Sequence, residues 1–261
     1  MKCTIGIVQI ASTWGNAQAT LLKAARCLRR AAEGGAHLCC FPEQFPTGWS
    51  PREIRSAEGP DGEIVHGLRT LAQEYGIAIL GSFTEQYDPH PRNTAIAIDP
   101  EGNILATYAK IHLFTPEEED MHYTPGDALA EFAVQGVRCG IAICYDLRFP
   151  ELFRLYAGRG VHCVLVPAAW PCVRMDAWHL FCRARALENQ FYLAGANCTG
   201  YSPIAHYCGG SVVVDPAGII ISSAGDAETL LLAEIDTDRI DEVRRAMPAI
   251  PDRREALYRT L

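Results

Sequence analysis

Three chemically reactive residues each follow directly on an apolar run. They are Glu43, Lys110 and Cys144. Loops at strand ends are where rigid α/β scaffolds present catalytic groups. A carboxylate beside a thiol supplies a base and a nucleophile, and a fixed ammonium can stabilise an oxyanion. The three residues together therefore predict acyl-transfer chemistry with a cysteine nucleophile.

Cys144 is predicted to stand at a turn that opens into a helix, because 145–154 follow an apolar strand. Backbone N–H groups at a helix start favour a thiolate, and the N–H of Tyr145 could donate to a developing oxyanion. The alternative is that Cys144 is a small buried hydrophobe, which is the commoner role of an isolated cysteine. The presence of Glu43 and Lys110 at the ends of two other apolar runs favours the catalytic interpretation.

Sequence motifs surround these three residues. In chain order they are Phe41-Pro42-Glu43, Tyr108-x-Lys110-x-His112-Leu113-Phe114 and Cys144-Tyr145-Asp146-x-Arg148-Phe149-Pro150-Glu151. In this order they resemble the three signatures of the nitrilase superfamily of carbon–nitrogen hydrolases, with matching flanks from Ile5 to about Asp236. The resemblance implies that Glu43, Lys110 and Cys144 form a catalytic triad that needs no metal and no cofactor.

Glu119 matches a fourth position of the same family. In related members a second glutamate lies four residues before the aromatic or apolar residue of a Pro-Gly turn, and Glu119 stands in this way before Tyr123 and 125–126. Since 117–119 are three consecutive acids, the alternative is a solvated acidic loop. The resemblance implies that Glu119 orients Lys110 or the incoming group.

The residues after the nucleophile favour an amide substrate. Tyr145 and Asp146 follow Cys144, where the nitrile-cleaving branch of the family has Trp and Glu. Arg148 could pair bidentately with a substrate carboxylate, which suggests a short acid with a terminal amide. The alternative for Arg148 is a buried salt bridge to Asp146 or Glu151.

Further segments, 42–49, 119–123 and 169–171, look most like the bacterial ω-amidase group, which hydrolyses 2-oxoglutaramate and succinamate. Aromatic residues line the small acyl pocket of that group. Trp49, Tyr123 and Trp170 are the candidates here, although each could equally be core packing. The alternatives are an N-carbamoyl amino acid amidohydrolase, a deaminated-glutathione amidase and a catalytically silent scaffold protein.

Composition narrows the class of protein. The chain has 261 residues, of which 49% are hydrophobic, and its formal charge is −8. Such a chain can bury a large core, and a net negative charge disfavours nucleic-acid binding. No apolar run approaches the length needed to cross a bilayer, so neither a membrane nor a nucleic-acid partner is expected. The resemblance implies a small-molecule amide as the partner.

Eleven cysteines would suit a secreted disulfide protein, yet the chain starts with an alternating strand pattern and not with a signal sequence. The odd count and the absence of any C-x-x-C pair argue against a disulfide framework, a zinc site and a redox or metal-handling protein. The histidines show no ligand spacing either, so no metal is expected. A cytoplasmic location fits best. The cysteines at 39, 40, 139 and 163 are predicted core residues.

Strands alternate with helices along the chain. The pattern predicts strands at 1–9, 38–41, 78–83, 93–99, 105–110, 162–167, 191–197, 210–214, 219–222 and 229–235, and helices at 16–33, 64–75, 151–159 and 177–189. Continuous apolar strands covered by helices imply an α/β protein with sheets buried on both faces.

The resemblance implies a four-layer α-β-β-α sandwich of the nitrilase type. One carbon–nitrogen hydrolase domain is expected over 1–261, and the tail at about 238–261, which the family predicts least, is interpreted as a solvated helix. The resemblance also implies a homodimer or a larger homo-oligomer that associates through helix 177–189 and the helix after Cys144.

Overall fold

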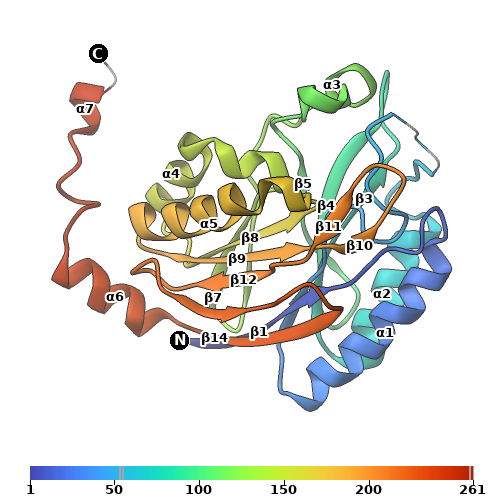
Figure 1. Ribbon diagram of the computed structural model, residues 1–261. Helices are drawn as coiled ribbons and strands as arrows, with labels where there is room; N and C mark the ends of the chain where they lie inside the picture. Colours follow the sequence, from blue (N-terminus) through green and yellow to red (C-terminus); the bar gives the residue numbers. More distant parts are fainter. Residues whose placement is uncertain (53, 55, 259, 261) are drawn as a thin grey trace.

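The structure is a computed structural model that describes residues 1–52, 54, 56–258 and 260. Two six-stranded sheets lie face to face, and helices cover the outer face of each sheet (Figure 1). The first sheet contains, in spatial order, β14 (Thr229–Asp236), β1 (Lys2–Gln9), β2 (Leu38–Cys40), β3 (Ala78–Glu85), β4 (Arg92–Ile98) and β5 (Ile104–Ala109). The second contains β13 (Ile220–Ser223), β12 (Val212–Val214), β9 (Tyr192–Asn197), β8 (Cys163–Ala168), β7 (Val137–Ile141) and β6 (Glu131–Val134).

Helices α1 (Ala17–Glu33) and α2 (Glu63–Tyr75) cover the first sheet, and α4 (Pro150–Gly158) and α5 (Met175–Asn189) cover the second. Short helical turns lie within the segments that connect the strands. They are η1 (Thr115–Glu117), α3 (Glu119–His122), η2 (Cys144–Arg148) and η3 (Cys172–Arg174). A small hairpin, β10 (Thr199–Tyr201) with β11 (His206–Cys208), stands apart from both sheets.

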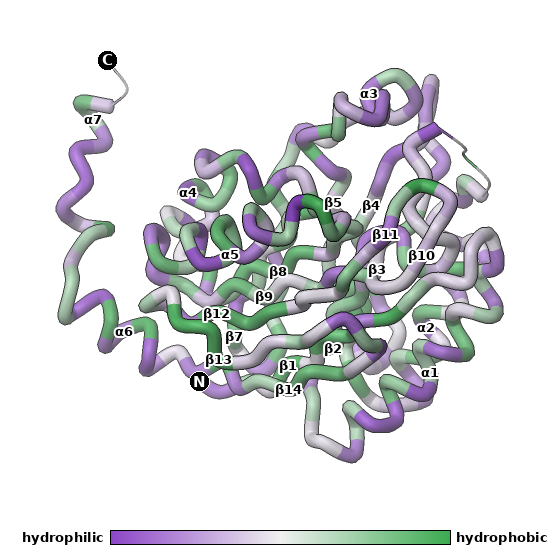
Figure 2. Tube along the Cα trace, in the orientation of Figure 1, coloured by the Kyte–Doolittle hydropathy of each residue, from purple (hydrophilic) through white to green (hydrophobic). Residues whose placement is uncertain are grey.

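The core confirms the predicted α-β-β-α layers. One apolar cluster lies between the two sheets and includes Ile7 and Ile141. A second joins α1 and α2 to the first sheet, and a third joins α4 and α5 to the second, with Trp178 at its centre. Each sheet therefore buries both faces, which is why its strands read as continuous apolar runs. Figure 2 shows these hydrophobic strands inside helices of mixed polarity.

Most predicted elements are confirmed to within two or three residues. Helix α1 begins where the Asn16 side chain accepts from the Ala19 N–H at 3.0 Å, and α2 ends at Gly76 with φ of 63°. The strand predicted at 210–214 begins only at Val212, because Gly209 and Gly210 both have positive φ. Strand β6 and the β10–β11 hairpin were not predicted, since their short segments carry little alternation.

The tail differs from the solvated helix that the sequence predicted. Helix α6 (Thr237–Ala246) buries Ile240 against the core between the sheets, so it is amphipathic. Beyond α6 the chain still contacts the body of the molecule, because Gln190 donates to the Met247 carbonyl at 2.6 Å and Ile250 packs against the third cluster. The short helix α7 (Glu255–Tyr258) then stands off from the two sheets (Figure 1). Among the described residues, no helix is both long and apolar enough to cross a membrane.

The cysteines were predicted only in part. Those at 39, 40, 139 and 163 are buried core residues, as expected. The argument against disulfides is wrong, because Cys172 and Cys208 are joined with their Cα atoms 5.0 Å apart. The pair is 36 residues apart along the chain, and it meets only because β11 packs against η3. A count and a spacing rule could not show that contact.

Candidate active site

The two sheets bring the predicted residues together at the carboxyl ends of three strands. Glu43 follows β2 and Lys110 follows β5 in the first sheet, whereas Cys144 follows β7 in the second. The Glu43 backbone N–H donates to the Ala168 carbonyl at the end of β8 at 3.3 Å, which ties the two sheets together beside the site. Sequence-distant strand ends therefore meet where the motifs predicted.

Cys144 sits on a strained turn between β7 and η2. Its φ is 47°, in the left-handed region that a residue with a side chain rarely adopts. Such a conformation costs about 1–3 kcal/mol and persists only when its surroundings hold it. The predicted turn is confirmed: it continues through η2 into α4, which begins at Pro150.

Asp146 is the residue that holds this turn. Its buried carboxylate accepts from the Ile143 N–H at 2.9 Å and from the Tyr108 hydroxyl at 2.7 Å. The backbone N–H of His112 donates to the same carboxylate at 2.9 Å, and the His112 Nδ1 lies 2.8 Å from it. His112 thus has a structural hydrogen-bonding role, and Asp146 links the Lys110 loop to the Cys144 turn.

Lys110 lies between two buried carboxylates. Its Nζ is 2.9 Å from Glu43 Oε1 and 2.8 Å from Glu119 Oε2. All three side chains are 1% exposed or less. Glu119 also accepts from the Phe114 N–H at 2.6 Å. The interpretation of Glu119 as part of a solvated loop is therefore wrong, although its neighbour Glu118 is exposed.

The thiol of Cys144 lies beside the carboxylate of Glu43, and each group affects the ionisation of the other. Burial and then the charge of Glu43 raise the pKa of Cys144 well above its usual range, and Lys110 only partly opposes them. This corrects the expectation that a helix start would favour the thiolate, because burial and the charge of Glu43 outweigh any such effect. The resting site therefore holds a thiol with its base already beside it.

Burial also affects the pKa values of Glu43 and Lys110. Burial raises the pKa of Glu43 above 4.5, and the nearby Lys110 moderates that rise. Burial alone would lower the pKa of Lys110, but Glu119 and Glu43 outweigh it and raise that pKa well above 10.5. Lys110 is thus a fixed cation, and Glu43 is a stronger base than an exposed glutamate.

A cavity of about 210 Å³ opens onto Cys144. Four other residues that the sequence proposed for the site also line it: Trp49, Tyr145, Arg148 and Trp170. A cavity of this size suits a small acyl group, with aromatic walls and a few polar anchors.

Tyr123 is not part of this cavity, contrary to the sequence prediction. Its ring is 2% exposed, its hydroxyl donates to the Ser50 carbonyl at 3.1 Å, and it accepts from Gln44 at 3.3 Å. These hydrogen bonds hold the loop after Glu43, and the Tyr123 ring is packed in the core. The alternative interpretation of Tyr123 as core is the correct one.

Arg148 lies in the cavity wall without a carboxylate partner in the described part of the chain. Its guanidinium is 5.1 Å from the Trp170 ring and 5.2 Å from the Phe181 ring. The predicted alternative, a salt bridge to Asp146 or Glu151, is absent among the described residues because the Asp146 carboxylate is occupied by the turn. A cation is thus available inside the cavity.

Comparison with known proteins agrees with this geometry. The family model for carbon–nitrogen hydrolases matches residues 4–245. The chain belongs to the carbon–nitrogen hydrolase family. The 2-oxoglutaramate amidase of Bacillus subtilis is 32% identical over 260 residues, covering 99% of this chain and all of that protein. The omega-amidase NIT2 of Homo sapiens is 33% identical, covering 90% of both chains.

Solved structures of the family superpose closely on this one. A CN-hydrolase superfamily protein from Xanthomonas campestris with an arsenic adduct in its active site has a TM-score of 0.91 at 30% identity, covering 97% of both chains. An amidase from Nesterenkonia, in which acrylamide has added to the active-site cysteine, has a TM-score of 0.89 at 30% identity and covers 99% of both chains. The fold predicted for this carbon–nitrogen hydrolase is confirmed.

Two residues near the hydrolase site were missed by the sequence reasoning. Asn93, fully buried on β4, donates through Nδ2 to Glu43 at 2.8 Å and to Glu119 at 3.2 Å. Arg174, at the end of η3, lines the same cavity as Arg148. Asn93 belongs to no motif, and the run 172–174 carries no periodicity, so only the three-dimensional arrangement reveals them.

Proposed function

We propose that this hydrolase cleaves the terminal amide of a short carboxylic acid, such as 2-oxoglutaramate or succinamate. The observation that carries the proposal is the place of Cys144 beside Glu43, itself bonded to Lys110, on the wall of a small cavity that is also lined by Arg148 and Arg174. Relatives named as 2-oxoglutaramate amidase and omega-amidase support this substrate class.

The first half of the reaction forms a thioester. Glu43 accepts the Cys144 proton, and the thiolate attacks the amide carbonyl. Lys110 and the Tyr145 N–H stabilise the tetrahedral oxyanion. Glu43 then returns the proton to the leaving nitrogen, so ammonia departs and the acyl group remains on Cys144.

The second half releases the acid. Glu43 takes a proton from water, and the resulting hydroxide attacks the thioester carbonyl. The Cys144 thiolate leaves and regains a proton from Glu43. Glu119 keeps Lys110 in place throughout, because it bonds the ammonium through both oxygens.

The test is ammonia release across a panel of ω-amides, N-carbamoyl amino acids and nitriles. We expect succinamate and 2-oxoglutaramate to be cleaved, and Cys144→Ala to lose all turnover while keeping its fold. Turnover of N-carbamoyl amino acids without turnover of either ω-amide would favour the rival amidohydrolase. Normal turnover by Cys144→Ala would overturn the mechanism.

The distal carboxylate is proposed to meet Arg148, Arg174 or both. The free acid should then be cleaved better than its methyl ester, by about ten- to a hundredfold in kcat/KM, because a charge-assisted hydrogen bond contributes about 1.5–3 kcal/mol. Arg148→Lys and Arg174→Lys form a matched pair that retains charge but loses the planar fork. The variant that loses the acid preference identifies the anchor, and equal rates for acid and ester in the wild type would refute it.

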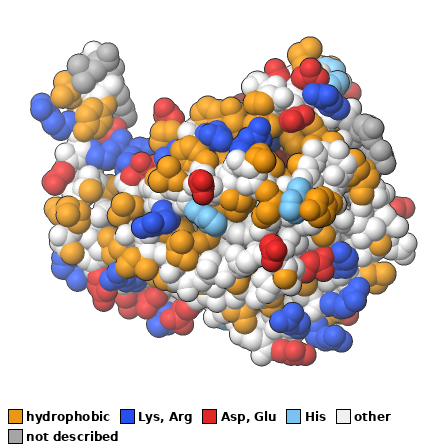
Figure 3. All heavy atoms as spheres, in the orientation of Figure 1, with side chains coloured by type: hydrophobic (Ala, Val, Ile, Leu, Met, Phe, Trp, Pro, Cys, Tyr) orange, Lys and Arg blue, Asp and Glu red, His pale blue; other side chains and the backbone are white. Residues whose placement is uncertain are grey.

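We also propose that the protein is a homo-oligomer and that it resides in the cytoplasm. Hydrophobic side chains gather over α4 and α5, among basic ones (Figure 3). Leu155, Leu180 and Leu187 on these helices are exposed in the single chain. Sedimentation should give a dimer or larger species, and Leu180→Glu should shift it toward the monomer. A monomeric wild type would refute the assembly.

A further inference from the structure

A disulfide connects two walls of the active-site cavity. Cys172 opens η3, between the cavity-lining residues Pro171 and Val173. Cys208 ends β11, next to the cavity-lining Tyr207. Reduction of this bond would leave two thiols side by side at the wall of the cavity, on segments that other contacts already hold together.

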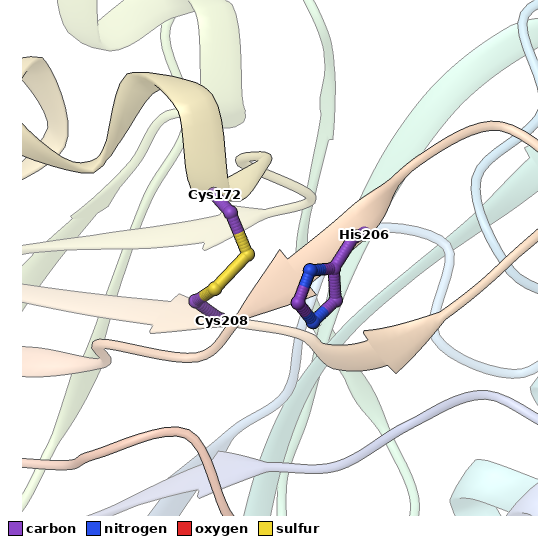
Figure 4. A group of neighbouring side chains, drawn as sticks. All are labelled: Cys172, His206 and Cys208. Atoms are coloured by element: carbon purple, nitrogen blue, oxygen red, sulfur yellow. A yellow bond between two sulfur atoms is a disulfide. The ribbon is translucent and has the colours of Figure 1, made fainter.

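A third donor stands beside the two sulfur atoms. The ring of His206, on the same strand as Cys208, lies next to the sulfur pair (Figure 4). The two Sγ atoms and a His206 ring nitrogen all lie within 4.8 Å of one another. His206 is exposed, and both cysteines are half-buried, so ions in solution can reach the group.

These three donors match the ligand preference of one kind of ion. Two thiolates and one imidazole suit Zn²⁺, which binds sulfur at about 2.3 Å and nitrogen at about 2.0–2.1 Å in tetrahedral geometry. Two sulfur ligands of one tetrahedral ion lie roughly 3.8 Å apart, by simple geometry from that bond length. That separation is smaller than the 4.8 Å within which all three donor atoms already lie, so a small rearrangement of the side chains is enough to form the site.

We propose that Cys172, His206 and Cys208 form a zinc site that becomes available when the disulfide is reduced. A dithiol reductant supplies two electrons and two protons, is itself oxidised to a disulfide, and leaves two protein thiols. Zn²⁺ then displaces both thiol protons and takes the neutral imidazole nitrogen as its third ligand. The fourth position is open to water. Disulfide and metal exclude each other, because both use the same two sulfur atoms.

Cobalt is the probe for the test, because Co²⁺ takes the place of Zn²⁺ and its absorption reports thiolate ligands and tetrahedral geometry. The background is Cys144→Ala, which removes the active-site thiol as a competing ligand. The protein is reduced with a phosphine, freed of phosphine and metal without oxygen, and titrated with Co²⁺. We expect one equivalent with sulfur-to-metal absorption that Zn²⁺ displaces, and no such band before reduction.

Matched variants separate this group from the other thiols. Adding Cys208→Ser should abolish the band, whereas adding Cys27→Ser, which removes a half-buried thiol on α1, should leave it unchanged. His206→Gln should weaken binding and shift the visible bands without touching the core, because His206 is exposed. The proposal is overturned if the reduced protein gives no cobalt–thiolate band, or if the band survives Cys208→Ser.

Discussion

Glu43→Gln should separate two roles of one carboxylate. Glu43 lies beside the Cys144 thiol, and its charge raises the pKa of that thiol, whereas Lys110 lowers it. Glutamine keeps the shape but removes the charge and the basicity. The thiol pKa should therefore fall in Glu43→Gln, while turnover fails because no group remains to carry the proton to the leaving ammonia or from the attacking water.

The expected losses of rate and of stability in Glu43→Gln follow from the surroundings of Glu43. A positioned general base contributes about 10²–10⁴ in rate, which at 1.36 kcal/mol per tenfold is about 3–5 kcal/mol of barrier. Stability should also drop, because Glu43 and Lys110 form a buried pair at 2.9 Å. Breaking such a pair costs about 3–5 kcal/mol when the charge is left alone. Since Glu119 still pairs with Lys110, the lower end is expected.

Glu119→Gln is the matched control. This change removes the other carboxylate from Lys110, so the unfolding free energy should fall by a comparable amount. Glu119 is not among the groups that raise the pKa of Cys144, so the thiol should be affected less. The assay measures kcat, urea unfolding and the pH midpoint of Cys144 alkylation. The midpoint should fall clearly in Glu43→Gln and move less in Glu119→Gln. Normal kcat in Glu43→Gln, or an alkylation midpoint above that of the wild type, would refute the reasoning.

Three other predictions test the base Glu43, the turn that holds Cys144 and the packing of the core. Because burial raises the pKa of Glu43, its basic form is lost as pH falls through a value above 4.5, so the acid limb of kcat/KM should have its midpoint above 4.5 and not at or below it. Asp146→Asn should cost about 1.5–3 kcal/mol in urea unfolding, because its carboxylate holds the turn through charged hydrogen bonds; an unchanged midpoint would contradict this. Gly195→Ala should destabilise by about 1–3 kcal/mol in thermal unfolding, because a Cβ there would lie 2.6 Å from Trp178, and a rise in Tm would contradict it.

Local features of the chain account for the elements and for the motif residues. Hydrophobic periodicity set the strands and helices, because a buried strand or an amphipathic helix needs its apolar residues at fixed spacing. Glu43, Lys110 and Cys144 were recognisable because each stands inside a motif of its own. The structure brings these three and Glu119 together. Arg148, predicted from its place after the nucleophile, lines the cavity, and so do Trp49 and Trp170, which the resemblance implied.

Contacts between distant segments decided the rest. Asn93 touches Glu43 and Glu119 only because β4 lies against the loops that carry them, and Tyr123 turns into the packing instead of the cavity. The resting thiol of Cys144 is likewise a property of burial, which no local pattern encodes.

The cysteine pairing shows the same limit most clearly. Cys172 and Cys208 lie far apart along the chain, in segments without a ligand motif, and meet only where β11 packs on η3. Spacing rules describe sites whose ligands are neighbours in sequence. The sequence by itself determined which elements form and which motif residues stand at their ends. Only the tertiary structure decided which side chains touch, because burial and charge act through space and depend on how distant segments pack.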